Sequence, residues 1–381
     1  MKILVWQWGR RGAGPRMATE MAAGLGRLPG HKVFLSLSTK AEILASADGP
    51  VCALPVKTYD DMAGYVCRLL ISPLSVWSLI RRIRKLAPDV AICAMPGPLD
   101  LVMVWALRLL GVKIVVTVHD ADLHPGDGFP MQMLLQHLLI RQADALIALT
   151  RHVAGRLAQQ QSARGKTVLT ASLPPFVFGA LPPPPLAHGG AMRLLCFGRL
   201  LPYKGLDLLE VALRDIGAVP PYEMRIVGQG PESETLKALG ALPHVQVENR
   251  WVPEDEVGVL IAWADAVVLP YREASQSGVA AIAIAAGRWV VATRVGGLEE
   301  QFRDEQLALL CEPEPVSIRA GLEQLLIAPP ALGPARADPG ERWREMAEQL
   351  ARQISSTLFS AGAPASRQPE EEGPQPSQVR A

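Results

Sequence analysis

Short apolar runs alternate with helical patterns along most of the chain. The first series of runs is KILVWQW, KVFLSLS, DVAICAM, KIVVTV and ALIALT, and a second series continues from MRLLCFG at Met192 to ALLCE at Glu312. Strands that are apolar on both faces are typical of a parallel sheet that helices cover on both sides. The pattern therefore predicts an α/β chain with two doubly wound, Rossmann-like domains that face each other across a cleft.

Proline marks the boundary between the predicted domains. The stretch LPPFVFGALPPPPLAHGG suits neither a helix nor a central strand, so residues 173–190 are predicted to link a domain over residues 1–172 to a second domain over residues 191–335. A helical pattern then predicts a C-terminal helix within residues 336–359. Residues 360–381 have almost no apolar content with which to offset the entropy of ordering, and they are predicted to be disordered.

Composition narrows the class of protein. A chain of 381 residues suits two domains of about 150 residues each, with a tail. Residues 1–172 hold 20 basic and 11 acidic side chains, and the remainder holds 18 and 26, so a basic half is joined to an acidic half. The five cysteines are scattered and form no C-x-x-C pair, which argues against a disulfide framework or a metal site.

The protein is predicted to stay in the cytoplasm. No secretory signal precedes the first strand, because Lys2 is followed by only a short apolar run. The best candidate for a membrane span, residues 99–118, carries Asp100, Arg108 and Lys113. No spanning helix is expected.

Two cations follow the first strand of the second series. In FGRLLPYKGLDLLEVAL, Gly198 and Arg199 end the strand, and Lys204 and Gly205 precede an amphipathic helix. One interpretation leaves both cations solvated in a turn. The other has them hold the phosphates of a ligand.

A glycine-rich loop follows the first strand of the chain. Gly9, Gly12 and Gly14 allow a tight turn close to a ligand, and the helix behind them offers free N–H groups and the positive end of its dipole. The spacing is not G-x-G-x-x-G, and no acidic residue follows FLSLSTK in the ribose-binding position. A nicotinamide dinucleotide site is therefore disfavoured.

Titratable side chains crowd the end of another strand. In TVHDADLHPGDG, His119, Asp120, Asp122 and His124 follow the apolar run KIVV. One interpretation has His119 cap the strand while the carboxylates face water, and the other has these side chains line a ligand site. A metal site is disfavoured, because the histidines lie on an irregular loop and no further pair of ligands is evident.

The polar turn REASQSG follows the strand DAVVLP. Ser275, Gln276, Ser277 and Gly278 stand at the start of a predicted helix, where bare N–H donors and hydroxyls suit a pyrophosphate. A serine that only caps the helix is the alternative.

Together these segments resemble glycosyltransferase family 4, the retaining, nucleotide-sugar-dependent enzymes of GT-B fold. The resemblance covers about residues 1–325 and is densest over residues 194–303. It implies a first domain on the acceptor side and a second domain that binds the nucleotide sugar. Five motifs in the family's order carry it: VVTVHD, FGRLLPYKGLDLL, RIVGQGPE, DAVVLPYREASQSGV and AAGRWVVATRVGGLEE.

The resemblance implies roles for individual residues. Arg199 and Lys204 would contact the donor diphosphate and stabilise the charge on the leaving nucleotide, and His119 would sit over the sugar as the third catalytic residue. Asp120 and His124 would lie on the acceptor side. The donor site would be formed by Gly12, Gly14, Gly198, Arg199, Lys204, Glu273, Ser275, Gln276, Ser277, Gly278 and Glu300.

One departure from the family concerns the ribose. Family members commonly carry two glutamates on this loop, but here the second position is Ile282 and the first falls at Ala274, beside Glu273. A subgroup of the family carries ASQSG here, so the departure does not exclude activity. Glu300 or Glu299 in GGLEE is the candidate to hold the ribose.

The resemblance also implies substrates and partners. A UDP- or GDP-sugar would be the donor, and a glycan or lipid-linked acceptor would receive the sugar in polysaccharide or glycolipid synthesis. Neither a metal nor a cofactor would be needed, because protein cations supply the charge. No nucleic acid partner is expected. The alternatives are a noncatalytic nucleotide-sugar-binding partner in an assembly complex and a GT-B-fold epimerase.

Residues 68–86, RLLISPLSVWSLIRRIRKL, combine apolar positions with a cluster of cations. The pattern predicts an amphipathic helix that only Pro73 interrupts. One interpretation packs the helix on the first sheet with its arginines in water. The other places it on an anionic membrane at the inner face, where about 1 kcal/mol from each cation would give reversible peripheral attachment.

Overall fold

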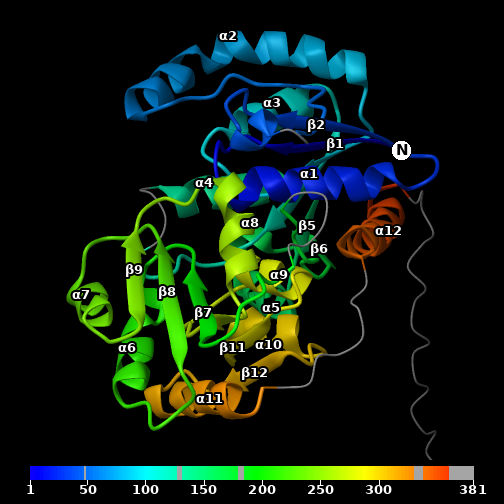
Figure 1. Ribbon diagram of the computed structural model, residues 1–381. Helices are drawn as coiled ribbons and strands as arrows, with labels where there is room; N and C mark the ends of the chain where they lie inside the picture. Colours follow the sequence, from blue (N-terminus) through cyan, green and yellow to red (C-terminus); the bar gives the residue numbers. More distant parts are fainter. Residues whose placement is uncertain (47–48, 127–130, 179–183, 330–337, 360–381) are drawn as a thin grey trace, which may run out of the picture.

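Two parallel six-stranded sheets form the framework of the molecule (Figure 1). The computed structural model describes residues 1–46, 49–126, 131–178, 184–329 and 338–359, without the side chains of residues 72–74. The predicted disorder of residues 360–381 and part of the predicted linker lie outside the described residues. The predicted α/β class with two doubly wound domains is confirmed by the two sheets.

The first sheet has the strand order β2-β1-β3-β4-β5-β6. The chain enters at β1 and extends the sheet in both directions, which is the doubly wound arrangement. The sequence pattern does not predict β6, because this short edge strand exposes Thr167 and Thr170 and has no apolar run. The strands are β1 (Lys2–Gln7), β2 (Lys32–Leu37), β3 (Val90–Cys93), β4 (Lys113–Val118), β5 (Ala145–Ala148) and β6 (Thr167–Thr170).

Helices cover both faces of the first sheet. On one face Trp6, Val76 and Met103 belong to a core that helices α2 to α5 close. On the other face Met17 and Met21 of α1 pack over Ile3 and its neighbours. The helices are α1 (Ala13–Gly26), α2 (Met62–Leu86), α3 (Asp100–Leu109), α4 (Gln132–Gln142) and α5 (Arg151–Gln159).

The second sheet has the strand order β12-β11-β10-β7-β8-β9 and is also covered on both faces. Its strands are β7 (Met192–Phe197), β8 (Tyr222–Gly228), β9 (Val245–Asn249), β10 (Ala266–Leu269), β11 (Trp289–Thr293) and β12 (Ala308–Cys311). Its helices are α6 (Leu206–Arg214), α7 (Glu234–Gly240), α8 (Glu254–Trp263), α9 (Gly278–Ala285), α10 (Gly296–Phe302) and α11 (Pro315–Ile327).

The two domains share one apolar core. The cluster that holds Met17 of α1 also holds Ile282 of α9 and Leu298 of α10. Apolar burial across the junction therefore helps to hold the two sheets in a fixed relation. This relation brings the carboxyl ends of β4 and β10 together, as the contacts of the next subsection show.

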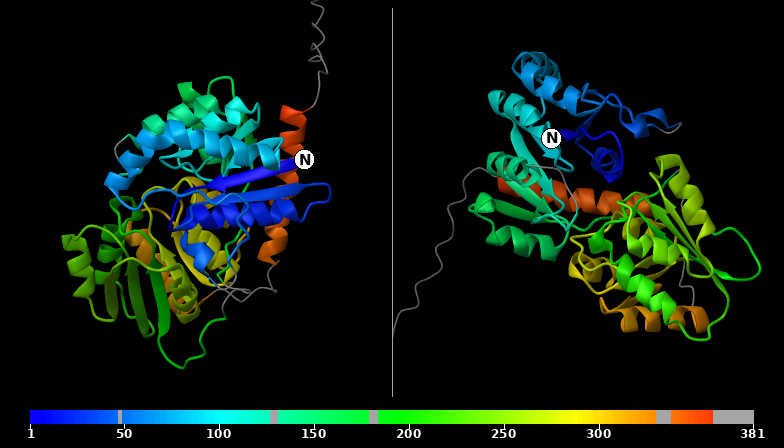
Figure 2. Two further views of the ribbon diagram at one scale, coloured as in Figure 1. Left: turned by 90° about the horizontal axis from the view of Figure 1, so that it is seen from above. Right: turned by 90° about the vertical axis from the view of Figure 1, so that its left-hand side faces the viewer.

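The C-terminal helix α12 (Pro339–Leu358) returns to the first domain and lies alongside α1 (Figures 1 and 2). The Trp343 indole N–H donates to the carbonyl oxygen of Pro175 at 3.0 Å. At Gly24 a Cβ atom would lie 2.7 Å from the Trp343 carbonyl oxygen, so only glycine allows this approach. The helix thereby fastens the end of the second half of the chain to the first domain.

Helix α2 is the outermost element of the first domain and is bent. Its arms, Met62–Ile71 and Ser75–Leu86, meet at 75°, and Pro73 lies between them. In the described part of the chain no single helix is long and apolar enough to cross a membrane, and the two arms of α2 pass that test only as a bent pair.

Candidate functional site

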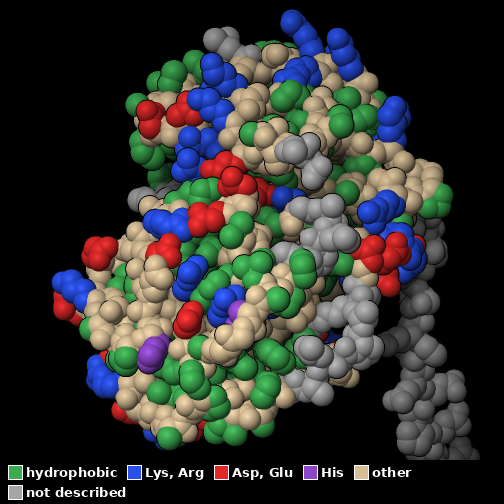
Figure 3. Space-filling model, viewed as in Figure 1, with side chains coloured by type: hydrophobic (Ala, Val, Ile, Leu, Met, Phe, Trp, Pro, Cys, Tyr) green, Lys and Arg blue, Asp and Glu red, His purple; other side chains and the backbone are tan. Residues whose placement is uncertain are grey.

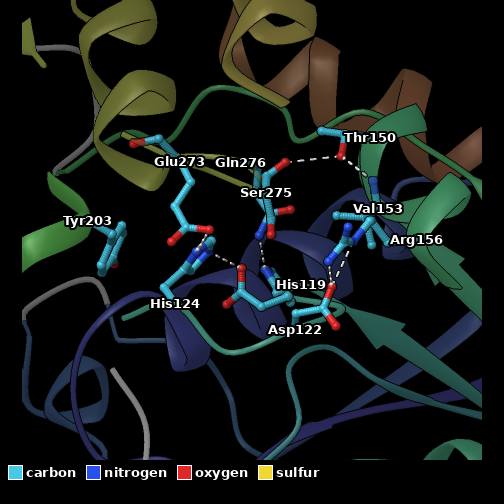
Figure 4. Close-up of polar contacts among 12 residues, drawn as sticks. His119, Asp122, His124, Thr150, Val153, Arg156, Tyr203, Glu273, Ser275 and Gln276 are labelled. Atoms are coloured by element: carbon cyan, nitrogen blue, oxygen red, sulfur yellow. Dashed lines mark hydrogen bonds and ion pairs between the residues drawn. The ribbon is translucent and has the colours of Figure 1, made fainter. Parts of the chain in front are cut away.

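The candidate site lies where loops that follow β4, β7 and β10 meet the start of α1. The carboxyl ends of parallel strands are the usual place for ligands in doubly wound sheets. His119 follows β4, Arg199 follows β7 and Gln276 follows β10, as the sequence predicts. Figure 4 shows that His119 and Gln276, from different domains, point toward each other.

His119 is buried, and both ring nitrogens are engaged. Nε2 lies 2.9 Å from the carbonyl oxygen of Ala94, which can only accept, so Nε2 carries the proton. Nδ1 is then the acceptor for the side-chain amide of Gln276 at 3.3 Å. Burial lowers the pKa of His119, which favours the neutral ring that this bonding requires.

His124 lies between two carboxylates and an aromatic ring (Figure 4). Its Nε2 is 3.2 Å from Asp120 Oδ1, its Nδ1 is 3.4 Å from Glu273 Oε2, and its ring stacks on Tyr203 with centroids 4.6 Å apart. Burial alone would lower the pKa of His124, but the two carboxylates outweigh burial and raise it. His124 therefore joins the loop after β4 to the loop after β10 by charge.

Asp120 is the counterpart of this cation. Burial alone would raise the pKa of Asp120, but hydrogen bonds from His124 and Ser275 and the nearby imidazoles hold it below its usual value. The carboxylate stays ionised and anchors both loops. Asp120 is thus a hydrogen-bond acceptor on the first domain, next to His119 in the sequence.

Tyrosine side chains contact both Arg199 and Lys204 in the loop after β7. Arg199 donates to the hydroxyl of Tyr203 at 3.1 Å. The Lys204 ammonium lies 3.6 Å from the centroid of Tyr271 and 4.8 Å from that of Tyr203. The tyrosine contacts position the two cations and bring no anion of their own.

Glycines shape the turn that carries these cations. Gly205 has φ 65°, and a Cβ atom there would lie 1.9 Å from the carbonyl oxygen of Pro270. Gly198 has φ 120° and lies close to Val279 in the first turn of α9. The turn after β7 is thus packed directly against the loop after β10 and the start of α9.

The first turn of α9 offers backbone donors. Ser277 caps the helix, since its hydroxyl accepts from the N–H of Ala280 at 3.2 Å. Among the described residues, the N–H groups of Gly278 and Val279 have no acceptor. The serine cap and the anion site are therefore compatible, because the cap occupies only one of the donors.

The start of α1 faces the start of α9. A Cβ atom at Gly278 would lie 4.0 Å from the Cβ of Ala13, so the two helix ends approach each other across the domains. Gly12, with φ 77°, precedes α1. A Cβ atom at Gly14 would lie 2.6 Å from Nε2 of the Gln7 side chain. Two positive dipole ends converge on the region between the domains, which suits an anionic ligand.

Comparisons with known proteins show which family the chain belongs to. Residues 12–171 match the family model described as glycosyl transferase 4-like domain, and residues 191–327 match that of glycosyl transferases group 1. A GDP-mannose-dependent alpha-(1-6)-phosphatidylinositol monomannoside mannosyltransferase of Mycolicibacterium smegmatis is 30% identical over 65% of this chain and 69% of its own. The chain belongs to glycosyltransferase family 4. It is therefore a retaining glycosyltransferase of GT-B fold.

Other relatives of this glycosyltransferase agree. A D-inositol 3-phosphate glycosyltransferase of Segniliparus rotundus is 30% identical over 60% of this chain and 56% of its own. Two solved structures share the fold at low identity. A sucrose-phosphate synthase of Thermosynechococcus elongatus is 15% identical with a TM-score of 0.63, covering 95% of this chain and 100% of that chain. A glycosyltransferase of Rickettsia africae is 14% identical with a TM-score of 0.63, covering 94% and 99%.

Glu300 of the glycosyltransferase is engaged away from the helix ends. Its carboxylate accepts from the backbone N–H groups of Arg151 at 2.8 Å and His152 at 2.9 Å, the first two residues of α5. Thr150 completes this junction, because its hydroxyl donates to the carbonyl oxygen of Ser275 at 3.0 Å. The structure thus shows Glu300 as an interdomain helix cap, and the ribose role stays a prediction.

The other ribose candidates differ in their surroundings. Glu299 is half-exposed and pairs with Arg294 at 3.2 Å. Ile282, at the position of the family's second glutamate, is buried within α9. Glu273 reaches His124, so it faces the acceptor-side pair that the sequence places on the first domain.

No role is assigned from the sequence to three side chains that support the site. Tyr203 and Tyr271 support the two cations, and each directly follows a proline in a loop after a strand. Gln301 orients Ser277, because its oxygen accepts from the Ser277 N–H at 2.7 Å and its amide donates to the Ser277 carbonyl oxygen at 3.2 Å. The tyrosines could have been found from their places in PYKG and PYRE, whereas Gln301 carries no local signal.

No cluster for a metal ion is seen within the described residues. A group of at least three His, Cys, Asp or Glu side chains arranged to hold such an ion is not found there. The resemblance to the family assigns the donor diphosphate to Arg199 and Lys204.

Proposed function

We propose that this glycosyltransferase moves a hexosyl unit from a UDP- or GDP-sugar to a lipid-linked acceptor without an essential metal ion. One observation supports the proposal above all. The loop after β7, which carries Arg199 and Lys204, and the first turns of α1 and α9 are three separate segments that meet at one place. A diphosphate is the ligand that this arrangement fits.

The cations act on the leaving group. The nucleotide diphosphate gains negative charge as its bond to the sugar breaks, and donors already held in place stabilise this charge more in the transition state than in the ground state. Tyr203 and Tyr271 hold Arg199 and Lys204 in position before the donor arrives. This supports a role for protein cations where other transferases use a metal.

His119 contacts the sugar in this proposal. Its neutral ring has Nδ1 directed to Gln276 of the second domain. A donor hydroxyl can take the place of the Gln276 amide at Nδ1, so the sugar would be held by the same nitrogen that joins the domains. Asp120 and His124 form the acceptor side, with Glu273 reaching over from the loop after β10.

Relatives support the choice of acceptor. The mannosyltransferase of Mycolicibacterium smegmatis is named for a phosphatidylinositol mannoside and for GDP-mannose. A glycolipid mannosyltransferase of Xanthomonas campestris, 32% identical over 26% of this chain, is likewise named for GDP-mannose. By analogy the acceptor here is lipid-linked, and the protein works from the cytoplasm, peripherally on the inner face of the membrane.

A thermal-shift screen tests the donor. A ligand that binds only the folded protein at about a hundred times its Kd stabilises it by about 2.7 kcal/mol. We expect UDP or GDP and one of their sugars to raise the melting temperature, and ADP to leave it unchanged. A melting temperature that none of these nucleotides moves would overturn the proposal.

Two further assays separate the finer claims. Transfer is expected to persist after exhaustive EDTA treatment, and its collapse would overturn metal independence. The noncatalytic alternative rests on Ile282, which stands where family members commonly carry a glutamate. Slow hydrolysis of the bound donor without acceptor is expected of a catalyst, and a bound donor that never releases its nucleotide would support the noncatalytic alternative.

A further inference from the structure

The first arm of α2, Met62–Ile71, projects apolar side chains into solvent. Met62, Val66 and Leu70 are four residues apart on one face of the helix, and their side chains are 71%, 50% and 77% exposed. The opposite side of the arm is held to the domain, since Arg68 donates to the Thr58 carbonyl oxygen at 3.0 Å. The arm is fixed in place with its apolar row uncovered.

Two further exposed apolar side chains are tryptophans, one on the second arm of α2 and one on the neighbouring helix α3. Trp77 lies on the second arm of α2 and is 65% exposed, although Val76 and Ile80 of the same arm are buried in the core. Trp105 lies on α3, which packs against α2, and is 47% exposed. Exposed indoles beside aliphatic side chains are typical of proteins that contact the interface of a bilayer.

The charged side chains of α2 are all basic. Residues 62–86 contain Arg68, Arg81, Arg82, Arg84 and Lys85 and no aspartate or glutamate. Lysine and arginine side chains gather over α2, with hydrophobic side chains among them (Figure 3), and Figure 2 shows α2 on the side of the first domain away from the second.

Acidic residues near these helices are engaged elsewhere. Asp60 pairs with Lys40 and Arg10, and Asp61 caps α2 by accepting from the Gly64 N–H at 2.7 Å. Asp100, on α3, is buried. The outer surface of these helices therefore presents cations and apolar groups together, which is the combination that anionic lipid attracts.

We propose that this surface, the α2–α3 face, docks on an anionic phospholipid bilayer. Its apolar side chains would enter the headgroup region while its cations meet lipid phosphates. This deepens the proposed function and rests on it for its purpose, because a docked first domain would receive a lipid-linked acceptor from the membrane. The α2–α3 face is defined by Val66, Leu70, Trp77, Trp105, Arg84 and Lys85.

Vesicle flotation with the full chain tests the docking. We expect the protein to float with vesicles of phosphatidylcholine and phosphatidylglycerol and to stay behind with phosphatidylcholine alone. Raising salt from about 0.1 M to about 1 M shortens the Debye length from about 10 Å to about 3 Å, and should release most of the bound protein. Wild-type protein that fails to float with the anionic vesicles at low salt would overturn the proposal.

Substitutions locate the contact. Leu70→Glu together with Trp77→Ser should weaken vesicle binding about tenfold, because both the apolar contact and the charge balance are lost. Arg84→Glu with Lys85→Glu should do the same. Val316→Glu is the matched control, since Val316 is 65% exposed on α11 of the second domain, and it should bind like wild type. Equal flotation of all variants would overturn the proposal that the α2–α3 face contacts the membrane.

Two measurements distinguish membrane docking from misfolding and from self-association. Each variant's melting temperature shows that it is folded. Size-exclusion chromatography over a range of concentrations shows whether Leu70→Glu abolishes self-association, which would assign the face to a second copy of the chain and overturn membrane docking. Nucleotide binding is measured without vesicles, so a failure of the donor proposal and a failure of docking are separate results.

Discussion

Gln276 of the second domain donates its side-chain N–H to Nδ1 of His119 in the first domain, across 3.3 Å. The other ring nitrogen is already committed to the Ala94 carbonyl oxygen at 2.9 Å. The Ala94 carbonyl thus sets the tautomer of the buried imidazole, and the Gln276 amide joins the loop after β10 to the loop after β4 through Nδ1.

Gln276→Glu reverses this contact. A carboxylate accepts where the amide donates, so it favours a proton on Nδ1 and should raise the pKa of His119. Turnover should fall about tenfold, because a charged imidazolium then replaces the neutral ring over the sugar. Ring ¹⁵N shifts followed against pH measure the titration directly. Gln246→Glu, on the exposed edge strand β9, is the control, and an unchanged His119 titration in Gln276→Glu would contradict this account.

Arg199→Ala and Lys204→Ala each remove a cation from the diphosphate side of the site. We expect turnover to fall about 100-fold or more for either variant, since donors aimed at developing charge contribute on this scale. The measurement is kcat for nucleotide release at saturating donor. Lys237→Ala, which removes an exposed lysine of α7, should leave kcat unchanged. A loss of less than threefold in both site variants would show that the leaving group is stabilised elsewhere.

The fold was predictable because its strands are buried on both faces. Runs such as KIVVTV can only be inner strands of a covered parallel sheet, and the structure has them there. The edge strand β6 lacks this signal because solvent replaces the covering helix. The helical period also predicts α12, but not its return to the first domain, which depends on Gly24 leaving room for Trp343.

The positions of site residues that follow strand ends could be predicted from the sequence. The contacts that site residues make between the domains could not. His119, Arg199 and Gln276 lie in loops whose places the strand order fixes. The engagement of Glu300 at the start of α5 depends on residues 149 positions away, and the support of Lys204 by Tyr271 depends on the packing of two loops. No local pattern carries either relation.

Asp100 predicts a dependence of stability on pH. Burial raises its pKa from 3.8 to about 6, although the carboxylate accepts from the Gly97 N–H at 2.6 Å and the Trp6 indole N–H at 3.1 Å. The folded state keeps the proton that the unfolded state has lost. This contribution is therefore fully present below pH 3.8 and is lost as pH rises through about 6, a change of about 3 kcal/mol.

Asp100→Asn removes that dependence. The free energy of unfolding of wild type relative to Asp100→Asn should fall by about 2 kcal/mol between pH 4 and pH 7, as read from urea unfolding at each pH. The asparagine also loses one hydrogen-bond acceptor for Gly97 or Trp6. This loss lowers the free energy of unfolding of the variant by an amount that does not depend on pH. Asp304→Asn, at an exposed position, should run parallel to wild type. A constant difference between wild type and Asp100→Asn would contradict the buried, protonated carboxyl.

Substitution of Glu300 distinguishes a helix-capping role of its carboxylate from a ribose-binding role. As a cap it accepts from the N–H groups of Arg151 and His152, where the α5 dipole is positive. Glu300→Ala should then lower the free energy of unfolding by about 1–2 kcal/mol and change the donor KM less than threefold. Glu299→Ala, which removes a half-exposed carboxylate of the same helix, should cost much less. A donor KM that rises tenfold in Glu300→Ala with no loss of stability would instead place this carboxylate on the ribose.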